Sequence, residues 1–282
     1  MKTLGEILQL TAQCFKEKNI ERPRRTAEEL LSFVLHLPRL ELYLQFDKPL
    51  VQDELNVLRD LVKRKLKGEP LEYLLGRVSF YGCTLTVTRD VLIPRPETEI
   101  LLDKACHRLK SLSLEGKKAW DLCTGSGCLG IGLKKTFPQL QVFLSDVSDK
   151  ALAVARNNAE TNGVSVACLK GDLLAPFAGS KADIILCNPP YVSNKEYDHL
   201  DSSVSAYEPK EALVGGEEGL FFYQRLSAEL PACLNPGALL FFEIGFSQGK
   251  AVQDLFLAPC WRHARIEKDF AGHDRFFFLE FE

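Results

Sequence analysis

Residues 118–130 read KAWDLCTGSGCLG, and this stretch decides the fold. An apolar segment with the length of a buried strand leads into a turn that contains Gly125, Ser126 and Gly127, and a helix-like segment follows. Backbone amides in such a turn can approach a ligand because no Cβ atoms obstruct them. A strand, a glycine turn and a helix in this order predict the start of an open α/β sheet with a ligand at its edge.

Strand-like and helix-like segments alternate from this turn onward. The further strands that we expect before the C-terminal pair are QVFLSD, SVACL, ADIILC and ALLFFEI, at residues 141–146, 165–169, 182–187 and 238–244. Helical stretches separate them, for example DKALAVARNNAETNG at 149–163. Strands that alternate with helices of this length form βαβ units, which predicts a mostly parallel sheet.

The last two strand-like segments differ from the others in how they are connected. HARIEKDF at 263–270 and DRFFFLEF at 274–281 are joined by Ala271, Gly272 and His273 alone. A link this short joins antiparallel neighbours, so the final strand is expected to be antiparallel. The predicted fold class is therefore α/β.

Residues 1–75 lack this alternation and are expected to form a small helical bundle. Thr26 and Glu29 predict a capping box at the start of one helix. Residues 52–67 repeat the helical pattern and end at Gly68, which predicts a C-cap.

Residues 78–93 change to a period of two around Tyr81 and Gly82, which predicts a pair of strands. We therefore expect a helical domain at 1–75, a β-hairpin linker at 76–94 and a sheet domain at 95–282.

The composition argues against several classes of function. The net charge of −3 gives no overall attraction for nucleic acid. No apolar run approaches the roughly 18 residues that span a bilayer, and Glu6 interrupts the segment that would form the core of a signal peptide. Nine cysteines without a C-x-x-C pair favour reduced thiols in a cytoplasmic protein over a metal site.

Acidic residues follow the next two strands. Asp146 ends its strand about 20 residues beyond the glycine turn, where a carboxylate can bind both hydroxyls of a ribose. With the turn, it predicts an adenosine-containing ligand, whereas Gly125-x-Gly127-x-x-Gly130 alone is a weak signal. Asp172, in Gly171-Asp172-Leu173, either accepts a hydrogen bond from an exocyclic amino group or caps the following turn.

Asn188-Pro189-Pro190-Tyr191 follows the strand at 182–187. The two prolines fix φ and hold the segment extended, so its carbonyls are free to face a substrate. Asn188 adds a side-chain acceptor and Tyr191 adds a flat ring. These groups suit a planar –NH2 group conjugated to a carbonyl or a heterocycle. Simple termination of the strand is the alternative, and the nearby glycine turn and Asp146 make it the weaker one.

The order of glycine turn, acidic residue and Asn-Pro-Pro-Tyr resembles that of S-adenosylmethionine-dependent methyltransferases with a seven-stranded, Rossmann-like class I sheet. Five further stretches resemble the release-factor glutamine-N5 methyltransferases (the HemK/PrmC family), and the similarity runs nearly from end to end. These stretches are GEPLEYLLG at 68–76, VLIPRPETEIL at 91–101, YEPKEALVGGEEGL at 207–220, FFEIGFSQG at 241–249 and EKDFAGHDR at 267–275.

The resemblance implies a reaction and a set of site residues. The substrate is the glutamine of the Gly-Gly-Gln loop of peptide chain release factors, and the helical domain binds that partner. Asn188 and Pro189 accept hydrogen bonds from the glutamine amide, Tyr191 packs against its plane, and no metal or general base is required. The catalytic residues are Asn188, Pro189, Pro190 and Tyr191, and Arg95 joins them in binding the substrate. The cofactor-binding residues are Thr124, Gly125, Ser126, Gly127, Asp146, Asp172, Leu173 and Asn188.

The sequence departs from the family pattern in three places. Cys123 replaces the first glycine of the cofactor turn, Ser79 replaces an acidic residue, and Leu85 replaces an aromatic residue. Because cysteine is small and Gly125 and Gly127 remain, we expect an intact, slightly narrowed turn.

Three other functions are weighed against this one. A nucleic-acid amino methyltransferase acting on adenine N6 or cytosine N4 would use the same motif, but the acidic net charge disfavours it. A nicotinamide-dependent oxidoreductase would leave Asn188–Tyr191 unexplained. A cofactor-binding scaffold without activity is favoured by Cys123 alone.

Overall fold

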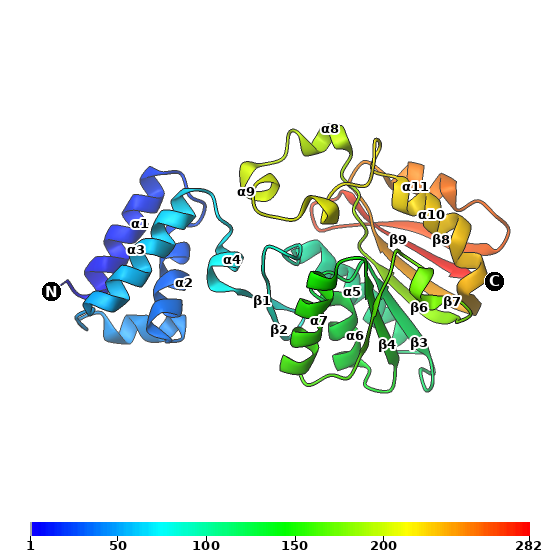
Figure 1. Cartoon of the computed structure of the whole chain (residues 1–282), viewed down its shortest axis with the longest axis horizontal. Helices are drawn as coiled ribbons and strands as arrows, with labels where there is room; N and C mark the ends of the chain where they lie inside the picture. The colour runs from blue at the N-terminus through cyan, green and yellow to red at the C-terminus, as the bar shows by residue number, and fades with distance from the viewer. Residues whose placement is uncertain (1) are drawn as a thin grey trace. The chain divides into compact units, whose positions relative to one another are not determined.

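The computed structural model describes residues 2–282, which fall into two compact units, residues 2–76 and 77–282 (Figure 1). The first unit is helical and the second contains a mixed sheet covered by helices. Each unit has its own apolar core.

The helical unit packs its helices around leucine side chains such as Leu30, Leu31 and Leu42. Its elements are α1 (Leu4–Glu17), α2 (Pro23–Leu35), the 3-10 helix η1 (Arg39–Gln45), α3 (Gln52–Leu66) and α4 (Leu71–Leu75). The predicted end of α3 is confirmed, since Gly68 follows the helix with φ +93° and its amide donates to the carbonyl of Lys65.

The predicted capping box at Thr26 is wrong. Helix α2 begins at Pro23, three residues earlier, because proline fits the first helical position, where its missing N–H is not needed. Thr26 therefore lies inside the first turn, and its hydroxyl donates to the carbonyl of Glu21 instead of capping the helix.

The second unit contains, within the described residues, a seven-stranded sheet with the order β5-β4-β3-β6-β7-β9-β8. Strands β3 to β7 are parallel, and β9 lies antiparallel between β7 and β8, which confirms the predicted α/β fold and its antiparallel last strand. The strands are β3 (Lys118–Leu122), β4 (Gln141–Asp146), β5 (Ala167–Lys170), β6 (Ala182–Cys187), β7 (Leu234–Glu243), β8 (Trp261–Lys268) and β9 (Asp274–Phe281).

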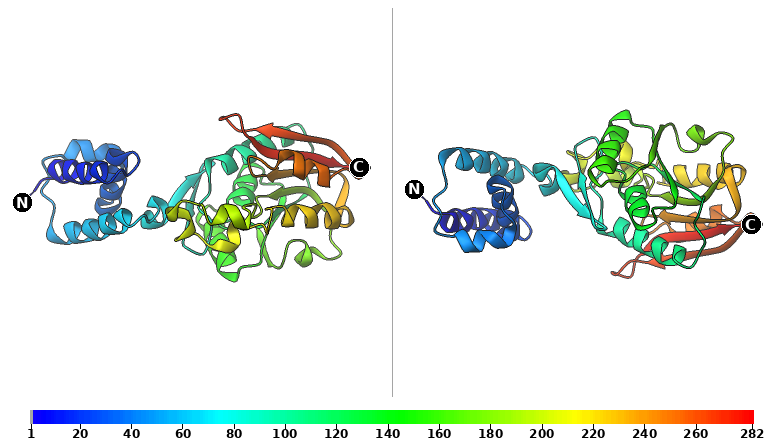
Figure 2. Two further views of the ribbon diagram at one scale, coloured as in Figure 1. Left: turned by 90° about the horizontal axis from the view of Figure 1, so that it is seen from above. Right: turned by 90° about the horizontal axis from the view of Figure 1, so that it is seen from below.

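Helices cover both faces of this sheet (Figure 2). Alternate residues of one strand point to opposite faces, so Phe241 of β7 packs in the cluster with α5, α6 and α7, and Phe242 packs in the cluster with α10 and α11. The helices are α5 (Pro96–Leu109), α6 (Cys128–Thr136), α7 (Asp149–Thr161), α10 (Phe221–Glu229) and α11 (Gly249–Leu255). Short helices fill the connections: η2 (Ala175–Phe177), α8 (Asn194–Tyr197), α9 (Ser202–Ser205), η3 (Lys210–Ala212) and η4 (Leu230–Cys233).

The predicted strand pair is a hairpin of β1 (Arg77–Phe80) and β2 (Cys83–Thr86), which belongs to the second unit. Tyr81 and Gly82 form its turn with φ of +44° and +70°, the backbone signs of a type I′ turn. Asn158 of α7 accepts from the amide of Thr86 at 2.7 Å and donates to its carbonyl at 3.0 Å. Asn162, the C-cap residue of α7, makes the same pair of bonds with Thr84, so the C-terminal part of α7 and its cap hold the hairpin through two side-chain amides.

The strand order changes direction at β3, since β4 and β5 lie on one side of it and β6 and β7 on the other. Ligands of open α/β sheets bind at such a point, beyond the carboxyl ends of the strands. The glycine turn after β3 and the Asn188–Tyr191 segment after β6 therefore meet at the edge where a site is expected.

Candidate active site

The turn after β3 contains three residues in the left-handed region, Cys123, Gly125 and Gly127, with φ of +55°, +54° and +84°. Glycine adopts this conformation without strain, whereas the Cβ atom of Cys123 makes it less favourable. A Cβ atom on Gly127 would lie 2.7 Å from Cδ1 of Ile131. One on Gly130 would lie 2.2 Å from a methyl carbon of Leu144, so α6 can approach the sheet only because this residue is glycine.

Asp121, near the end of β3, stabilises this turn through hydrogen bonds to its side chain. Its side chain is buried, and Oδ2 accepts hydrogen bonds from the hydroxyl of Thr124 at 2.6 Å and from the amide of Gly130 at 2.9 Å. Burial raises the pKa of Asp121 to about 7, against the lowering effect of these two bonds. The sequence analysis missed this residue, although an aspartate inside the buried stretch AWDL is the signal that reveals it.

Asp146, at the end of β4, connects the turn that follows β4 with the glycine turn that follows β3. Its Oδ2 accepts from the amide of Gly125 at 2.9 Å, and its Oδ1 accepts from the amide of Ser148 at 2.9 Å. Burial raises its pKa in spite of these bonds. A carboxylate has about four acceptor positions, so both oxygens retain capacity for a ligand.

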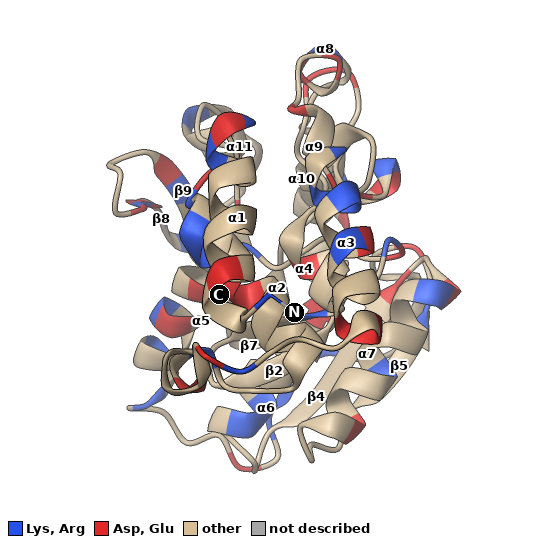
Figure 3. Ribbon diagram, turned by 90° about the vertical axis from the view of Figure 1, so that its left-hand side faces the viewer, with Lys and Arg blue, Asp and Glu red and all other residues tan. Residues whose placement is uncertain are grey.

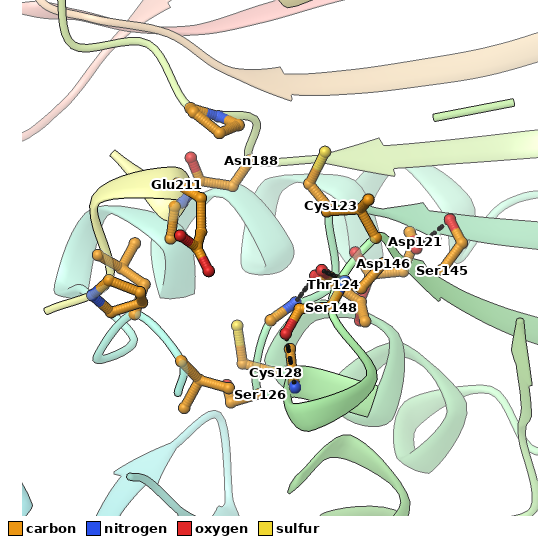
Figure 4. A pocket seen from close by; sticks show the side chains of 18 of the residues that line it. Asp121, Cys123, Thr124, Ser126, Cys128, Ser145, Asp146, Ser148, Asn188 and Glu211 are labelled. Atoms are coloured by element: carbon orange, nitrogen blue, oxygen red, sulfur yellow. Dashed lines mark hydrogen bonds between the residues drawn. The ribbon is translucent and has the colours of Figure 1, made fainter. Parts of the chain in front are cut away.

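A cavity with an empty volume of about 980 Å³ opens above the carboxyl ends of β3, β4 and β6 (Figure 4). Ligands of open α/β sheets bind in this position, beyond the carboxyl ends of the strands. Eight predicted site residues line the cavity: Thr124, Gly125, Ser126, Asp146, Asp172, Leu173, Asn188 and Pro190. Four do not: Arg95, Gly127, Pro189 and Tyr191. Glu211, which the sequence analysis did not consider, is also part of the lining.

Asp172 lies at the rim of the cavity and is engaged by Arg225 of α10. Both carboxylate oxygens of Asp172 accept from Nη1 of Arg225 at 2.8 Å. The helix that follows, η2, has Leu174 at its N-cap and no side-chain cap, so the capping role considered for Asp172 is not observed. Leu173 is buried beside it with φ +48°.

The Asn188–Tyr191 segment is fixed by contacts on both sides. Pro189 and Pro190 are buried. A Cβ atom on Gly215 would lie 2.3 Å from the carbonyl oxygen of Pro190, and one on Gly219 would lie 2.1 Å from that of Tyr191. The glycines of the stretch at 207–220 are therefore required for it to pack against this segment.

Two side chains of this segment reach the same buried carboxylate. Nδ2 of Asn188 donates to the hydroxyl of Thr98 at 3.2 Å, and that hydroxyl donates to Oε2 of Glu243 at 2.6 Å. The hydroxyl of Tyr191 donates to Oε1 of Glu243 at 3.2 Å. Burial raises the pKa of Glu243 and, together with the carboxylate, that of Tyr191. The sequence analysis missed both Thr98 and Glu243.

Tyr191 and Arg95 are not part of the cavity lining and contact other residues of the sheet unit. The Tyr191 ring packs against the apolar cluster that contains Tyr223 and Phe242, and its contact with a substrate amide stays a prediction. Arg95 forms an ion pair with the buried carboxylate of Glu208, which also accepts from the amide of Ile93 at 3.1 Å. This pair ties residues 91–95 to the segment that carries Glu211.

Comparisons with known proteins agree with this geometry. Residues 6–76 match the family model of the PrmC N-terminal domain, and residues 98–205 match that of the methyltransferase small domain. A release factor glutamine methyltransferase of Thermodesulfovibrio yellowstonii is 39% identical over 91% of this chain and 92% of its own length. One of Geobacter sulfurreducens is 39% identical over 97% and 95%. The chain belongs to the release factor glutamine methyltransferase family.

The family membership and the methyltransferase class predicted from the sequence are thereby confirmed. A methyltransferase of Pyrococcus furiosus, 19% identical, superposes with a TM-score of 0.53 over 78% of this chain and 96% of its own, which shows a shared fold. In the part of the chain that the structure describes, no cluster of three or more His, Cys, Asp or Glu side chains is arranged to hold a metal. The helices of residues 2–282 are too short or too polar to cross a bilayer.

The lining of the cavity fits the adenosine cofactor of this family. The turn at Cys123–Gly127 brings backbone amides to one side of the cavity, and space is open around Gly125, where a Cβ atom would meet nothing within 4 Å. Asp146 supplies carboxylate oxygens to the same space, and Asn188 lies on its other side (Figure 4). A carboxylate acceptor beside an open glycine turn suits a ribose and its attached groups.

Proposed function

We propose that this protein methylates the side-chain amide nitrogen of the glutamine in the Gly-Gly-Gln loop of peptide chain release factors, using S-adenosylmethionine. The observation that carries the proposal is the placement of Asn188 at the edge of the cavity that also contains the turn and Asp146. Within residues 2–282, the one side-chain hydrogen bond of Asn188 uses Nδ2, so Oδ1 is left for a ligand. A free amide oxygen is the acceptor that a substrate –NH2 group needs.

The cofactor supplies a methyl group that is already activated on a sulfonium. In this proposal the turn that contains Gly125 and Gly127 faces it, Asp146 binds its ribose hydroxyls through its remaining lone pairs, and Asp172 and Leu173 border its base. Thr124 and Ser126 complete the turn, and Asn188 separates the cofactor from the substrate.

The chain must overcome the low reactivity of an amide nitrogen, whose lone pair is delocalised into the carbonyl. Asn188 Oδ1 accepts one hydrogen of the substrate amide, and the carbonyl of Pro189 accepts the other. These bonds hold the nitrogen in line with the methyl group and strengthen as the nitrogen becomes tetrahedral. Positioning of this kind contributes up to about 7–11 kcal/mol in ideal cases.

A protein substrate fits the charge of this chain better than nucleic acid does. The net charge is −3, and acidic and basic residues are interspersed along the helices (Figure 3). A nucleic-acid amino methyltransferase would be expected to carry a concentrated basic surface.

We also propose that the helical domain at 1–75 binds the release factor and that Arg95 borders the substrate. All nine cysteines are free thiols, which favours a reducing compartment such as the cytoplasm.

Mass spectrometry of a release factor incubated with this protein and S-adenosylmethionine tests the proposal. We expect one added methyl group on the glutamine of the Gly-Gly-Gln loop. A release factor in which alanine replaces that glutamine is the matched control and should gain none. Methylation of the control, or of added DNA or RNA in place of the release factor, would contradict the proposal.

A further inference from the structure

Glu243 is a buried carboxylate directly behind the candidate acceptor site. It ends β7, its side chain is 1% exposed, and both of its oxygens accept hydrogen bonds from side-chain hydroxyls. Thr98, near the start of α5, is 2% exposed and is the residue that joins this carboxylate to Asn188. Thr98 and Glu243 lie 145 positions apart in the sequence, so the fold alone brings them together.

Asn188, Thr98 and Glu243 are linked by two consecutive hydrogen bonds, and the number of available protons determines which group donates in each. A carboxylate only accepts, so the single proton of the Thr98 hydroxyl points to Oε2 of Glu243. The lone pairs of that hydroxyl are then all that Thr98 offers to Asn188. Only the –NH2 end of the Asn188 amide can pair with a lone pair, and therefore Nδ2 faces Thr98.

The opposite orientation of the Asn188 amide would place Oδ1 against the Thr98 oxygen with no proton between them. Two acceptors facing each other in a buried position lose a hydrogen bond and gain none. The pair of Thr98 and Glu243 therefore distinguishes between two orientations of an amide that are equivalent in shape.

We propose that Thr98 and Glu243 are positioning residues that present Oδ1 of Asn188 to the substrate –NH2 group. The inference rests on the proposed function and names the residues on which its specificity for an –NH2 donor depends. Thr98 and Glu243 act through Asn188 and carry no proton to or from the substrate.

The test compares Thr98→Val with Thr98→Ser. Valine has the shape of threonine and removes the hydroxyl, whereas serine keeps the hydroxyl and removes the methyl group. We expect Thr98→Val to lower kcat about tenfold or more, as the loss of one oriented hydrogen bond implies, with S-adenosylmethionine affinity in calorimetry within about threefold. Thr98→Ser is expected to restore kcat to within about threefold of the wild type.

Thr136→Val is the matched control, because Thr136 is also a threonine of the sheet unit whose hydroxyl donates one hydrogen bond, to the carbonyl of Gly132 at 2.8 Å, and it ends α6 outside the cavity lining. It should leave kcat unchanged, whatever it does to the melting temperature. Glu243→Asp is a second variant, which keeps the charge but withdraws the oxygens from Thr98. It is expected to lower kcat by a similar factor and decides the matter if Thr98→Val does not fold.

The wild-type enzyme in the same assay separates this inference from the proposed function. A wild type that methylates no release factor glutamine contradicts the proposed function. A wild type that does so, alongside a folded Thr98→Val or Glu243→Asp variant with wild-type kcat, overturns the positioning role. Thr98→Ser as slow as Thr98→Val would also overturn it, since packing of the methyl group would then be the cause.

Discussion

The two sides of the cavity are held by different kinds of contact. The proposed cofactor side, formed by Cys123–Gly127 and Asp146, is held by two backbone amides that donate to Asp121 and Asp146, with the Thr124 hydroxyl as a side-chain donor to Asp121. The proposed acceptor side, formed by Asn188–Tyr191 with Thr98 and Glu243, is held by hydrogen bonds between side chains, in which Glu243 is the final acceptor.

This difference determines what each side tolerates. Backbone amides are present at every residue except proline, so the turn keeps its contacts with a cysteine in place of a glycine. The side-chain network depends on the identity of each member. Substitutions on the cofactor side are therefore expected to change affinity or stability, and those on the acceptor side are expected to change turnover.

The largest effect is expected for Asn188→Ala. Losing Oδ1 removes a bond that strengthens in the transition state, so kcat should fall by about two orders of magnitude or more. S-adenosylmethionine affinity, measured by calorimetry, should stay within a few fold. Asn235→Ala removes a half-buried amide that donates to Asp183 at the other edge of the sheet and should leave kcat unchanged. Near-normal methyl transfer by Asn188→Ala would remove the distinction between the two sides.

Asp146→Ala should weaken S-adenosylmethionine binding by about 1–3 kcal/mol, the usual loss for a hydrogen-bonding partner of a ligand. Calorimetry measures this change directly. Asp183→Ala is the control, because Asp183 also accepts from a backbone amide, that of Lys118 at 2.9 Å, but does not line the cavity. Equal losses of affinity in the two variants would show that the effect is structural.

Gly130→Ala should destabilise the sheet unit. The added methyl group would lie 2.2 Å from a carbon of Leu144, which is fully buried, and 3.1 Å from Cβ of Asp121. The expected cost of overpacking is about 1–3 kcal/mol in the free energy of unfolding, measured with denaturant. Gly5→Ala in α1 is the control: its new methyl group would contact Phe46 at 3.4 Å, so the better helix propensity of alanine should stabilise or leave the protein unchanged. A stabilised Gly130→Ala protein would contradict the close approach of α6.

The smallest effect is expected for Cys123→Gly. The left-handed conformation costs about 1–2 kcal/mol for residues other than glycine, and the substitution removes this cost. Glycine also increases the conformational entropy of the unfolded chain, which lowers the stability of the folded protein by about 0.4–1 kcal/mol. The melting temperature should therefore rise slightly, and S-adenosylmethionine affinity should rise because the turn widens. His36→Gly relieves the same strain at φ +52°, in the helical unit, and should leave affinity unchanged. Weaker binding by Cys123→Gly would show that the thiol contacts the cofactor.

The sequence predicted features that depend on neighbouring residues. Alternating strands and helices, the hairpin turn at Tyr81 and Gly82 and the glycine turn all follow from local patterns and local backbone preferences. The error at Thr26 was also local, since Pro23 was a stronger signal for the helix start than the capping pattern. Eight of the predicted site residues line one cavity because the carboxyl ends of parallel strands meet at one edge.

The sequence did not reveal partners that are distant along the chain. The pairs of Thr98 with Glu243 and of Arg95 with Glu208 span 145 and 113 residues. A single sequence gives no indication of which distant hydroxyl or carboxylate will be close in space. Acidic residues inside apolar strands, as at Asp121 and Glu243, mark where such partners are needed, because a buried carboxylate without hydrogen bonds is very costly.

The side-chain amides of Asn158 and Asn162 have a consequence for self-association. They bond to Thr86 and Thr84 as a neighbouring strand would, and so they occupy backbone groups that would otherwise be a template for another chain. Nδ2 of Asn158 also donates to the carbonyl of Ser126 at 2.9 Å. The Asn158 side chain, which pairs with the edge of the hairpin, is therefore also bonded through Nδ2 to the turn proposed to bind the cofactor. Hydrogen exchange at the Thr86 amide should slow when a ligand occupies that turn.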